Sequence, residues 1–142
     1  MEDPFDLERF VLAQESGRTY QRALEELRKG EKQSHWMWFV FPQVAGLGQS
    51  PTSRKYAITS LAEAEAYLRH PVLGPRLLES ASAAAAHTGL TAERIFGGTD
   101  AQKLRSSMTL FLRAAPDKPV FEEVLDRYFD GSPDPATDRL LG

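Results

Sequence analysis

Apolar residues recur at helical spacing along this chain, and several of the stretches end at a glycine. Tyr20, Ala23, Leu24 and Leu27 follow the i, i+3, i+4, i+7 pattern of one helix face, and Gly30 stands just beyond them. A second set in the same register is Phe121, Val124, Leu125 and Tyr128, closed by Gly131. Because a strand alternates at every second residue instead, the pattern predicts an all-α fold.

Short polar residues stand where the expected helices begin. A hydroxyl or carboxylate at such a position accepts a hydrogen bond from a backbone N–H of the first helical turn. Ser50 precedes Pro51, and Ser60 is followed three residues later by Glu63, as in a capping box. The expected N-caps are Asp6, Thr19, Ser34, Ser50, Ser60, Thr91 and Thr99. The acids Glu63, Glu65 and Glu79 are expected at the surface.

The length of 142 residues fits a single domain over 1–142 and allows a buried core. No apolar run approaches the roughly 20 residues that cross a bilayer, and the acidic start lacks the layout of a secretory signal. The chain has no cysteine, which excludes disulfides and thiolate metal sites. We therefore expect a cytoplasmic protein without membrane contact.

The charge of the chain is unevenly distributed. Its formal net charge of -3 argues against general nucleic-acid binding, which needs a basic face. Two stretches are nonetheless basic. Five Lys or Arg residues stand against one Glu between Arg28 and Tyr56, and three stand against none between Ala101 and Arg113. This pattern favours an anionic ligand such as a phosphate or carboxylate, although solvated helix faces give it too.

The segment 32–43 has the most unusual composition in the chain. Its aromatic part, Trp36 to Phe41, suits a buried strand or a helix, and because its neighbours are helical we expect a short helix ended by Pro42. Aromatic walls here would hold a flat group, while a lysine, hydroxyls and backbone hold an anion. The candidate ligand-binding residues are Lys32, Ser34, Trp36, Trp38, Gln43, Gly46, Gly48, Ser53 and Tyr56. A packed core needs the same aromatic residues.

A second polar group lies on the helix expected from Thr99 to Pro116. Its apolar face points inward and its polar face adds an acid, a base and two hydroxyls. The apolar face is Leu104, Met108 and Phe111, and the polar residues are Asp100, Lys103, Ser106 and Ser107, of which the last three are candidate ligand-binding residues. The alternative is that Asp100 stabilises the helix start, Lys103 pairs with it, and the serines bond to backbone carbonyls.

His35 and Asp100 are the candidate catalytic residues, as acid or base, if the pocket carries out chemistry. His35 also suits a hydrogen bond to a backbone carbonyl that orients the loop. The three histidines have no metal-ligand spacing, and the chain has no glycine-rich phosphate-binding motif. We therefore predict neither a metal site nor a cofactor.

Several of these motifs together resemble the family catalogued as domain of unknown function eighteen-ten. The motifs are the run from Gly30 to Gln43, Gly46 to Gly48, Ser53 to Ile58, Tyr67 to Gly74, Ile95 to Gly97 and Asp100 to Phe111. The chain departs from the family at Thr137-Asp138, where an apolar residue usually follows the threonine. The resemblance implies a single multihelical domain with a central bundle surrounded by shorter helices.

The leading hypothesis is a pocket for a small anionic ligand, such as a nucleotide or an ADP-ribose derivative, with possible hydrolysis. In size and in its late polar helix the family is similar to helical proteins that process ADP-ribosylated or NAD-derived compounds. The alternative is a protein-interaction module, which predicts that some of Trp36, Trp38 and Phe41 form an exposed patch. A nucleic-acid binder would need the two basic stretches to form one continuous strip.

Overall fold

Helices of very different lengths build the computed structural model, which describes residues 3–142. They are α1 (Glu8–Glu15), the 3-10 helix η1 (Ser16–Arg18), α2 (Thr19–Lys29), α3 (Met37–Val40), α4 (Pro51–Lys55), α5 (Leu61–Arg69), α6 (Leu73–Ala85), α7 (Ala92–Phe96), α8 (Gly98–Ala114), α9 (Pro119–Phe129) and α10 (Pro135–Leu141). Within residues 3–142 the pairing of extended backbone is limited to one parallel bridge, Val44 to Ile58. The predicted all-α class is confirmed.

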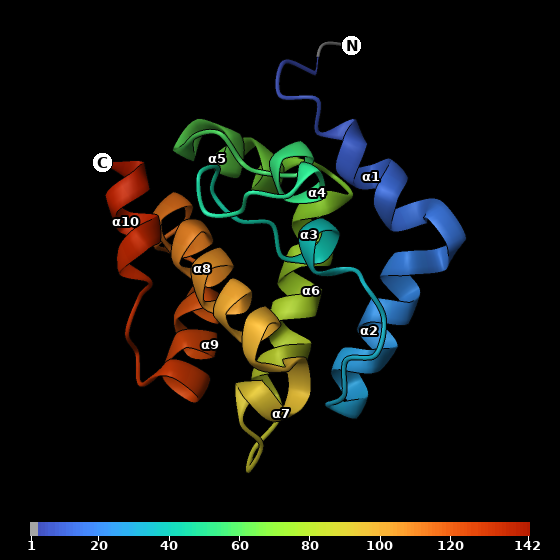
Figure 1. The fold of residues 1–142 in the computed structure, drawn as a ribbon, viewed down its shortest axis with the longest axis vertical. Coiled ribbons are helices and arrows are strands. Elements are labelled where there is room, and N and C mark those ends of the chain that lie inside the picture. Colours follow the sequence, from blue (N-terminus) through green and yellow to red (C-terminus); the bar gives the residue numbers. More distant parts are fainter. Residues whose placement is uncertain (1–2) are drawn as a thin grey trace.

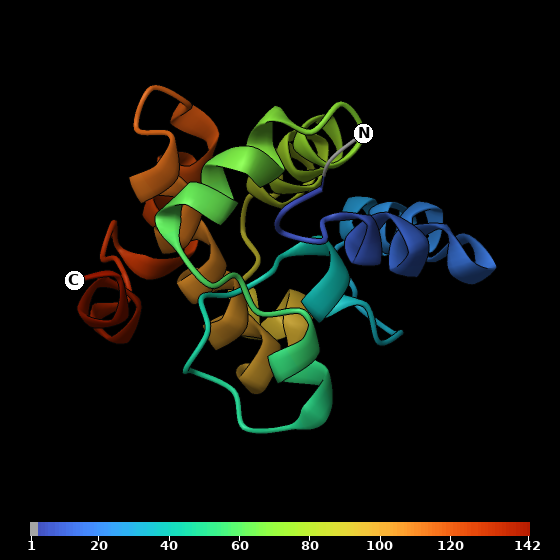
Figure 2. The same ribbon diagram turned by 90° about the horizontal axis from the view of Figure 1, so that it is seen from above.

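The bundle is centred on α6 and α8 (Figure 1). Helix α8 packs against α5, α7, α9 and α10, while α6 packs against α2, α5 and α9. Seen from above, α1 and α2 project on one side and α10 lies on the opposite side (Figure 2). No helix among the described residues has the length and apolar character to cross a membrane.

A line of aromatic rings crosses the core from α1 to α9. Phe10 meets Tyr67 edge-on with ring centroids 5.2 Å apart, Tyr67 lies 5.4 Å from Phe111, and Phe111 lies 5.8 Å from Phe121. All four side chains are fully buried. Aromatic pairs in these arrangements add stability beyond the area that they bury. The helical apolar pattern read in the sequence therefore does select core residues.

The helix starts confirm some of the predicted N-caps. The hydroxyls of Ser50, Ser60 and Thr91 each accept a hydrogen bond from the backbone N–H three residues later. The predictions for Asp6, Thr19 and Thr99 were wrong. Asp3 takes the place of Asp6, the Thr19 hydroxyl donates backwards to Ser16 O, and α8 begins before Thr99, at Gly98.

Arg9 is the polar centre of the N-terminal half. Its guanidinium donates to the carbonyl oxygens of Phe5, Asp6, Lys55 and Ala57, and its Nη2 lies 2.9 Å from Glu63 Oε2. Glu63 is buried, which corrects its expected place at the surface; its other oxygen accepts two hydrogen bonds from Thr59. A buried ion pair is tolerated when its remaining donors and acceptors are satisfied, as they are here.

Replacing Arg9 by Met should lower the free energy of unfolding by about 3 kcal/mol, because Glu63 would stay buried without its counter-ion. The matched control is Arg113→Met. Arg113 also makes two hydrogen bonds to one carboxylate, Asp138, but both side chains are about 40% exposed, at 41% and 40%. The control should cost less than about 1 kcal/mol. Urea unfolding of both variants measures the difference, and equal losses would contradict the structural role given to Arg9.

Candidate functional site

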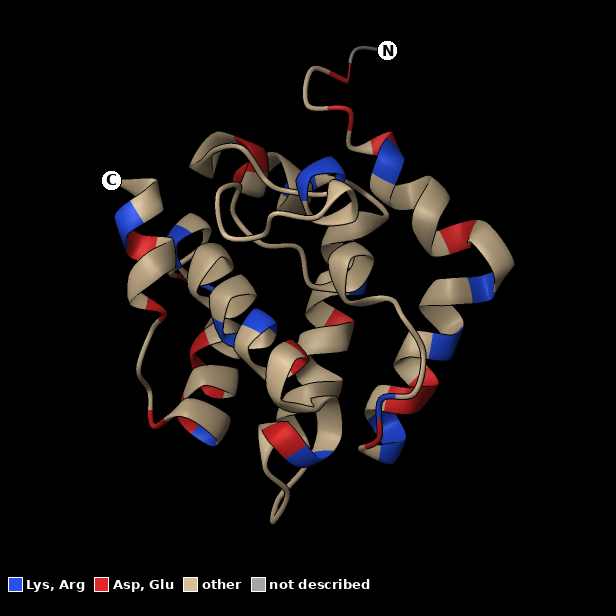
Figure 3. Ribbon diagram, viewed as in Figure 1, with Lys and Arg blue, Asp and Glu red and all other residues tan. Residues whose placement is uncertain are grey.

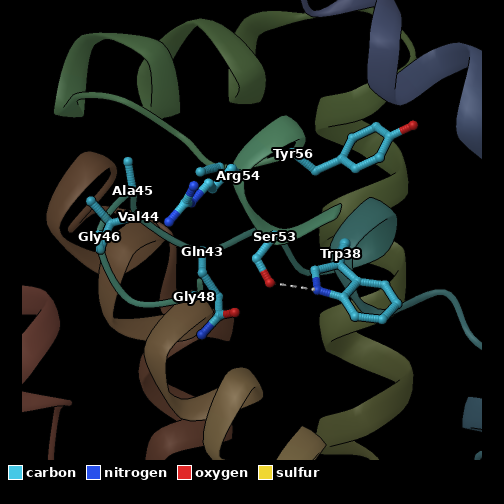
Figure 4. A pocket seen from close by; sticks show the side chains of 10 residues that line it. Trp38, Gln43, Val44, Ala45, Gly46, Gly48, Ser53, Arg54 and Tyr56 are labelled. Carbon is cyan, nitrogen blue, oxygen red and sulfur yellow. Dashed lines mark hydrogen bonds between the residues drawn. The ribbon is translucent and has the colours of Figure 1, made fainter. Parts of the chain in front are cut away.

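Two adjoining cavities lie where the segment 43–57 faces α8 and α10. The smaller has a volume of about 110 Å³ and is lined by the segment itself together with Trp38 (Figure 4). The larger has a volume of about 400 Å³ and extends to α8 and the start of α10. Both are lined by Gln43, Gly48 and Ser53. These three residues therefore form the junction between the cavities.

The two ends of the segment 43–58 are held together by backbone hydrogen bonds. Ile58 N–H donates to Gln43 O at 2.8 Å, and Ala45 N–H donates to Ile58 O at 2.8 Å. Inside the loop, a Cβ on Gly48 would lie 2.4 Å from Ser53 Cβ, so only glycine allows this approach. The Ser53 hydroxyl lies 2.8 Å from that of Ser50 and accepts from Trp38 Nε1 at 3.3 Å (Figure 4).

The two basic stretches of the sequence meet at Asp100. Its Oδ2 lies 2.8 Å from Lys32 Nζ and its Oδ1 lies 3.4 Å from Lys103 Nζ. Lys103 Nζ also lies 4.5 Å from the centre of the Trp38 ring, where a cation is attracted by the π electrons. Lys103 reaches the larger cavity. One carboxylate thus joins two ammonium groups, and the group of three keeps one net positive charge.

A chain of hydrogen bonds connects the cavity to the last helix. Gln43 Nε2 donates to Ser106 Oγ at 3.1 Å, and Ser106 Oγ lies 3.2 Å from Thr137 Oγ1. The Thr137 hydroxyl donates to Asp134 Oδ2 at 2.6 Å. Asp134 is buried, caps α10 through Thr137 N–H, and accepts from Gln102 Nε2 through its other oxygen.

Sequence reasoning missed Asp134, Thr137 and Gln102. Asp134 was nonetheless detectable, because Asp134-Pro135 repeats the signal of a cap followed by proline that identified Ser50-Pro51. Thr137 has no comparable signal, since its role comes from contact with a helix about thirty positions earlier. The departure from the family at Asp138 also has a structural counterpart, because Asp138 pairs with Arg113 of α8.

Eight of the predicted ligand-binding residues line the cavities. They are Trp38, Gln43, Gly46, Gly48, Ser53, Tyr56, Lys103 and Ser106. The other predicted residues lie elsewhere. Lys32 and Asp100 form the ion pair behind Lys103, and Ser107 is fully buried with no hydrogen-bond partner in the described part of the chain. His35 is exposed and makes no hydrogen bond to the residues that the structure describes.

Ser34 and Trp36 belong to a different site, around Glu26 of α2. The prediction that Ser34 caps a helix was wrong, because α3 begins only at Met37 and the Ser34 hydroxyl donates to Glu26 Oε2 at 2.6 Å. The Glu26 carboxylate also accepts from the backbone N–H groups of Gln33 and Ser34 and from Trp36 Nε1. Trp36 is 1% exposed and belongs to the core, beside Phe41 and Phe96.

Burial by itself would raise the pKa of Glu26. The hydrogen bonds outweigh this effect, the Ser34 hydroxyl and Gln33 N–H first and then Trp36 Nε1 and Ser34 N–H, and they lower the pKa to about 2. Glu26 therefore holds the segment 31–36 to the end of α2 as an ionised acceptor. Sequence reasoning missed it because the pattern marks it only as one polar residue on a helix.

The exposed aromatic patch required by the protein-interaction alternative is not found at the expected residues. Trp36 and Phe41 are 1% and 0% exposed, and Trp38 is only partly exposed. The nucleic-acid alternative requires a continuous basic strip. Figure 3 shows Lys and Arg positions interspersed with Asp and Glu positions along the ribbon, and Lys32 is paired with Asp100. In the range 3–142 no group of three or more His, Asp or Glu residues is placed to hold a metal ion.

Comparison with known proteins supports the fold. The model of the family described as Protein of unknown function (DUF1810) matches residues 4–141. The crystal structure of the conserved hypothetical protein Rv1873 from Mycobacterium tuberculosis is similar, with a TM-score of 0.95, 51% sequence identity and 98% of each chain covered. A search of curated proteins gives no match. The stretch that the family model matches includes all the segments that line the cavities.

The Glu26 network predicts a pH dependence of stability. The free carboxyl has a pKa of 4.5 and the folded one about 2, so the ionised form stabilises the fold above pH 4.5. This contribution is about 3 kcal/mol at neutral pH and is lost as the pH falls from 4.5 towards 2. Glu26→Gln should therefore be much less stable than wild type at pH 7, with a gap that narrows below pH 4.5.

Urea unfolding at a series of pH values measures that gap. Glu25→Gln is the matched control, because Glu25 is the exposed neighbour on the same helix and the same charge is removed. The control should differ little from wild type at any of these pH values. A Glu26→Gln gap that does not change with pH would contradict the lowered pKa.

Proposed function

As this chain belongs to the DUF1810 family of proteins of unknown function, we propose a function from the geometry of its cavities: it binds a small anionic ligand there. The class that fits best is a nucleotide or an ADP-ribose derivative, with a flat ring, polar edges and a phosphate. The observation that carries the proposal is the Lys103 ammonium, held over the Trp38 ring at the edge of the larger cavity.

The size and lining of the cavities support this class of ligand. The larger cavity, at about 400 Å³, falls within the range of small-molecule sites, and the smaller one opens beside it. Trp38 and Tyr56 supply aromatic surface in the smaller cavity, while Gln43, Ser53 and Ser106 supply hydrogen-bonding groups. A mainly apolar wall with a few polar groups is the usual composition of a ligand site.

The cations at the two cavities favour an anion in their neighbourhood. Asp134 also lines the larger cavity, where the neutral donors of Thr137 and Gln102 hold its carboxylate. Lys103 shares Asp100 with Lys32, so its positive charge is only partly compensated. Arg54 adds a second cation at the smaller cavity. A partly buried cation beside a cavity attracts anions more strongly than an exposed one does.

The geometry of the cavities supports ligand binding better than it supports catalysis. Neither His35 nor Asp100, the two acid-base candidates, is among the residues that line the cavities. Asp100 is engaged by two lysines, and His35 is exposed on the segment before α3. A general acid or base must lie within hydrogen-bond reach of the reacting group.

Lys103→Met tests the proposal, because it removes the ammonium and keeps an apolar side chain against Trp38. The ligand panel holds AMP, NAD, ADP-ribose, ribose 5-phosphate and inorganic phosphate, and thermal melting is the measurement. A ligand at 100 times its dissociation constant should raise Tm by roughly 3 °C or more in the unmodified protein. The rise should disappear in Lys103→Met.

The matched control is Lys118→Met, which removes the same charge from an exposed position before α9. It should keep the full rise in Tm. A panel in which no compound changes Tm would count against the proposal, and so would a rise that survives in Lys103→Met.

A further inference from the structure

We infer that the ligand of these cavities donates an N–H hydrogen bond to Gln43 Oε1, as the amino group of an adenine nucleotide does. The inference rests on the proposed function and goes further, because it specifies one polar contact and the chemistry of the group that makes it. It comes from the direction of the hydrogen bonds that connect Gln43 to Asp134.

The direction is set at Asp134. This residue is 5% exposed, and its Oδ2 accepts from Thr137 N–H at 3.1 Å and from the Thr137 hydroxyl at 2.6 Å. An ionised carboxylate only accepts hydrogen bonds. The single proton of the Thr137 hydroxyl is therefore committed to Asp134.

Each hydroxyl has one proton, and this decides the direction of the next two hydrogen bonds. Thr137 Oγ1 and Ser106 Oγ lie 3.2 Å apart, and because the Thr137 proton points to Asp134, the proton between the two hydroxyls comes from Ser106. Ser106 Oγ is then free only as an acceptor towards Gln43. The group of Gln43 that faces it at 3.1 Å must be the amide nitrogen. The nitrogen and oxygen of an amide are assigned from such partners, so the chain determines which way Gln43 points.

Gln43 consequently directs its oxygen away from Ser106. In Figure 4 this oxygen lies on the side of Ser53 and Trp38, and the nitrogen lies on the opposite side. Gln43 lines both cavities, so its oxygen is placed as an acceptor at their junction. A ligand that fills the junction and offers no donor leaves this oxygen unsatisfied, which costs affinity.

The surroundings select a ring with an amino group over other donors. The smaller cavity, of about 110 Å³, holds the volume of a few water molecules, and we assign the flat ring to it, beside Trp38. The phosphate of the ligand is assigned to the larger cavity, which Lys103 lines. Amides of Gln and Asn commonly recognise adenine in this way, by accepting from its amino group.

The test compares AMP with purine riboside 5′-monophosphate, which differs from AMP only by lacking the ring amino group. Isothermal titration calorimetry of the full chain measures both dissociation constants. AMP should bind about tenfold more tightly, or better, because the analogue leaves Gln43 Oε1 without a partner. Equal affinities would overturn the inference while leaving the proposed function standing. If neither nucleotide binds, the inference fails, and the proposed function fails with it only when no other compound of the thermal-melting panel raises Tm.

Thr137→Val tests the chain of hydrogen bonds at a residue outside the cavity lining. The change removes the hydroxyl, so the Ser106 proton becomes available to Gln43 Oε1 and the amide can turn round. The preference for AMP should then fall to about twofold or less. The matched control is Thr109→Val. Thr109 is also buried, and its hydroxyl accepts from the backbone N–H of Asp134, but it is not part of the series of hydrogen bonds from Gln43 to Asp134.

Thr109→Val should therefore keep the tenfold preference even if it lowers stability. If both variants lost the preference for AMP equally, the preference would be due to general packing, and the inference would be overturned. A second readout needs no ligand. In the free protein, a through-space NMR contact between the Gln43 side-chain NH2 and the Ser106 Cβ protons should be present, and it should weaken in Thr137→Val only. Its absence from the unmodified protein would also overturn the inference.

Discussion

The position of the candidate site depends on one guanidinium group that is not part of it. Arg9 of α1 binds the carbonyl oxygens of Lys55 and Ala57 and the carboxylate of Glu63, and so holds the end of α4 against the start of α5. Ile58, which follows Ala57, forms backbone hydrogen bonds with Gln43 and Ala45. A guanidinium has five donors in a rigid plane, so it can hold several chain segments in one geometry where a lysine could hold only a point. The wall of both cavities is thereby tied to the N-terminal helix.

The sequence predicts well what is decided locally. The apolar spacing of α2 and α9 and the caps at Ser50 and Ser60 depend on residues within one or two turns, and the structure confirms them. The sequence predicts poorly those features that depend on contacts between distant segments. Arg9 and Glu63 are 54 positions apart, and each alone has the appearance of an ordinary surface charge. Burial of a charge becomes possible only through a partner that the local pattern does not reveal.

The predictions for the candidate site also differ according to whether local sequence or distant contacts decide the outcome. Trp36 and Trp38 were predicted together, yet Trp36 is in the core with its N–H on Glu26, and Trp38 faces Ser53 at the cavity. Two positions apart in a helical or turn conformation, the two side chains point to different sides, and composition does not say which side is inward. Gly48 shows the opposite case. It was singled out for its lack of a side chain, and the close approach of Ser53 is the physical reason that the position needs it.

An acidic protein can still place a cation at a cavity when neighbouring carboxylates hold that cation in position. The chain carries a net charge of -3, but Asp100 is shared by Lys32 and Lys103, and Asp134 is engaged by Thr137 and Gln102. Both carboxylates act on the cavity indirectly, one by holding a lysine beside Trp38 and the other by directing the hydroxyls that orient Gln43. Because α8 carries Lys103 and Ser106 one turn apart on a long, well-packed helix, the bundle sets the distance between the ammonium group and the hydroxyl that accepts from Gln43 Nε2.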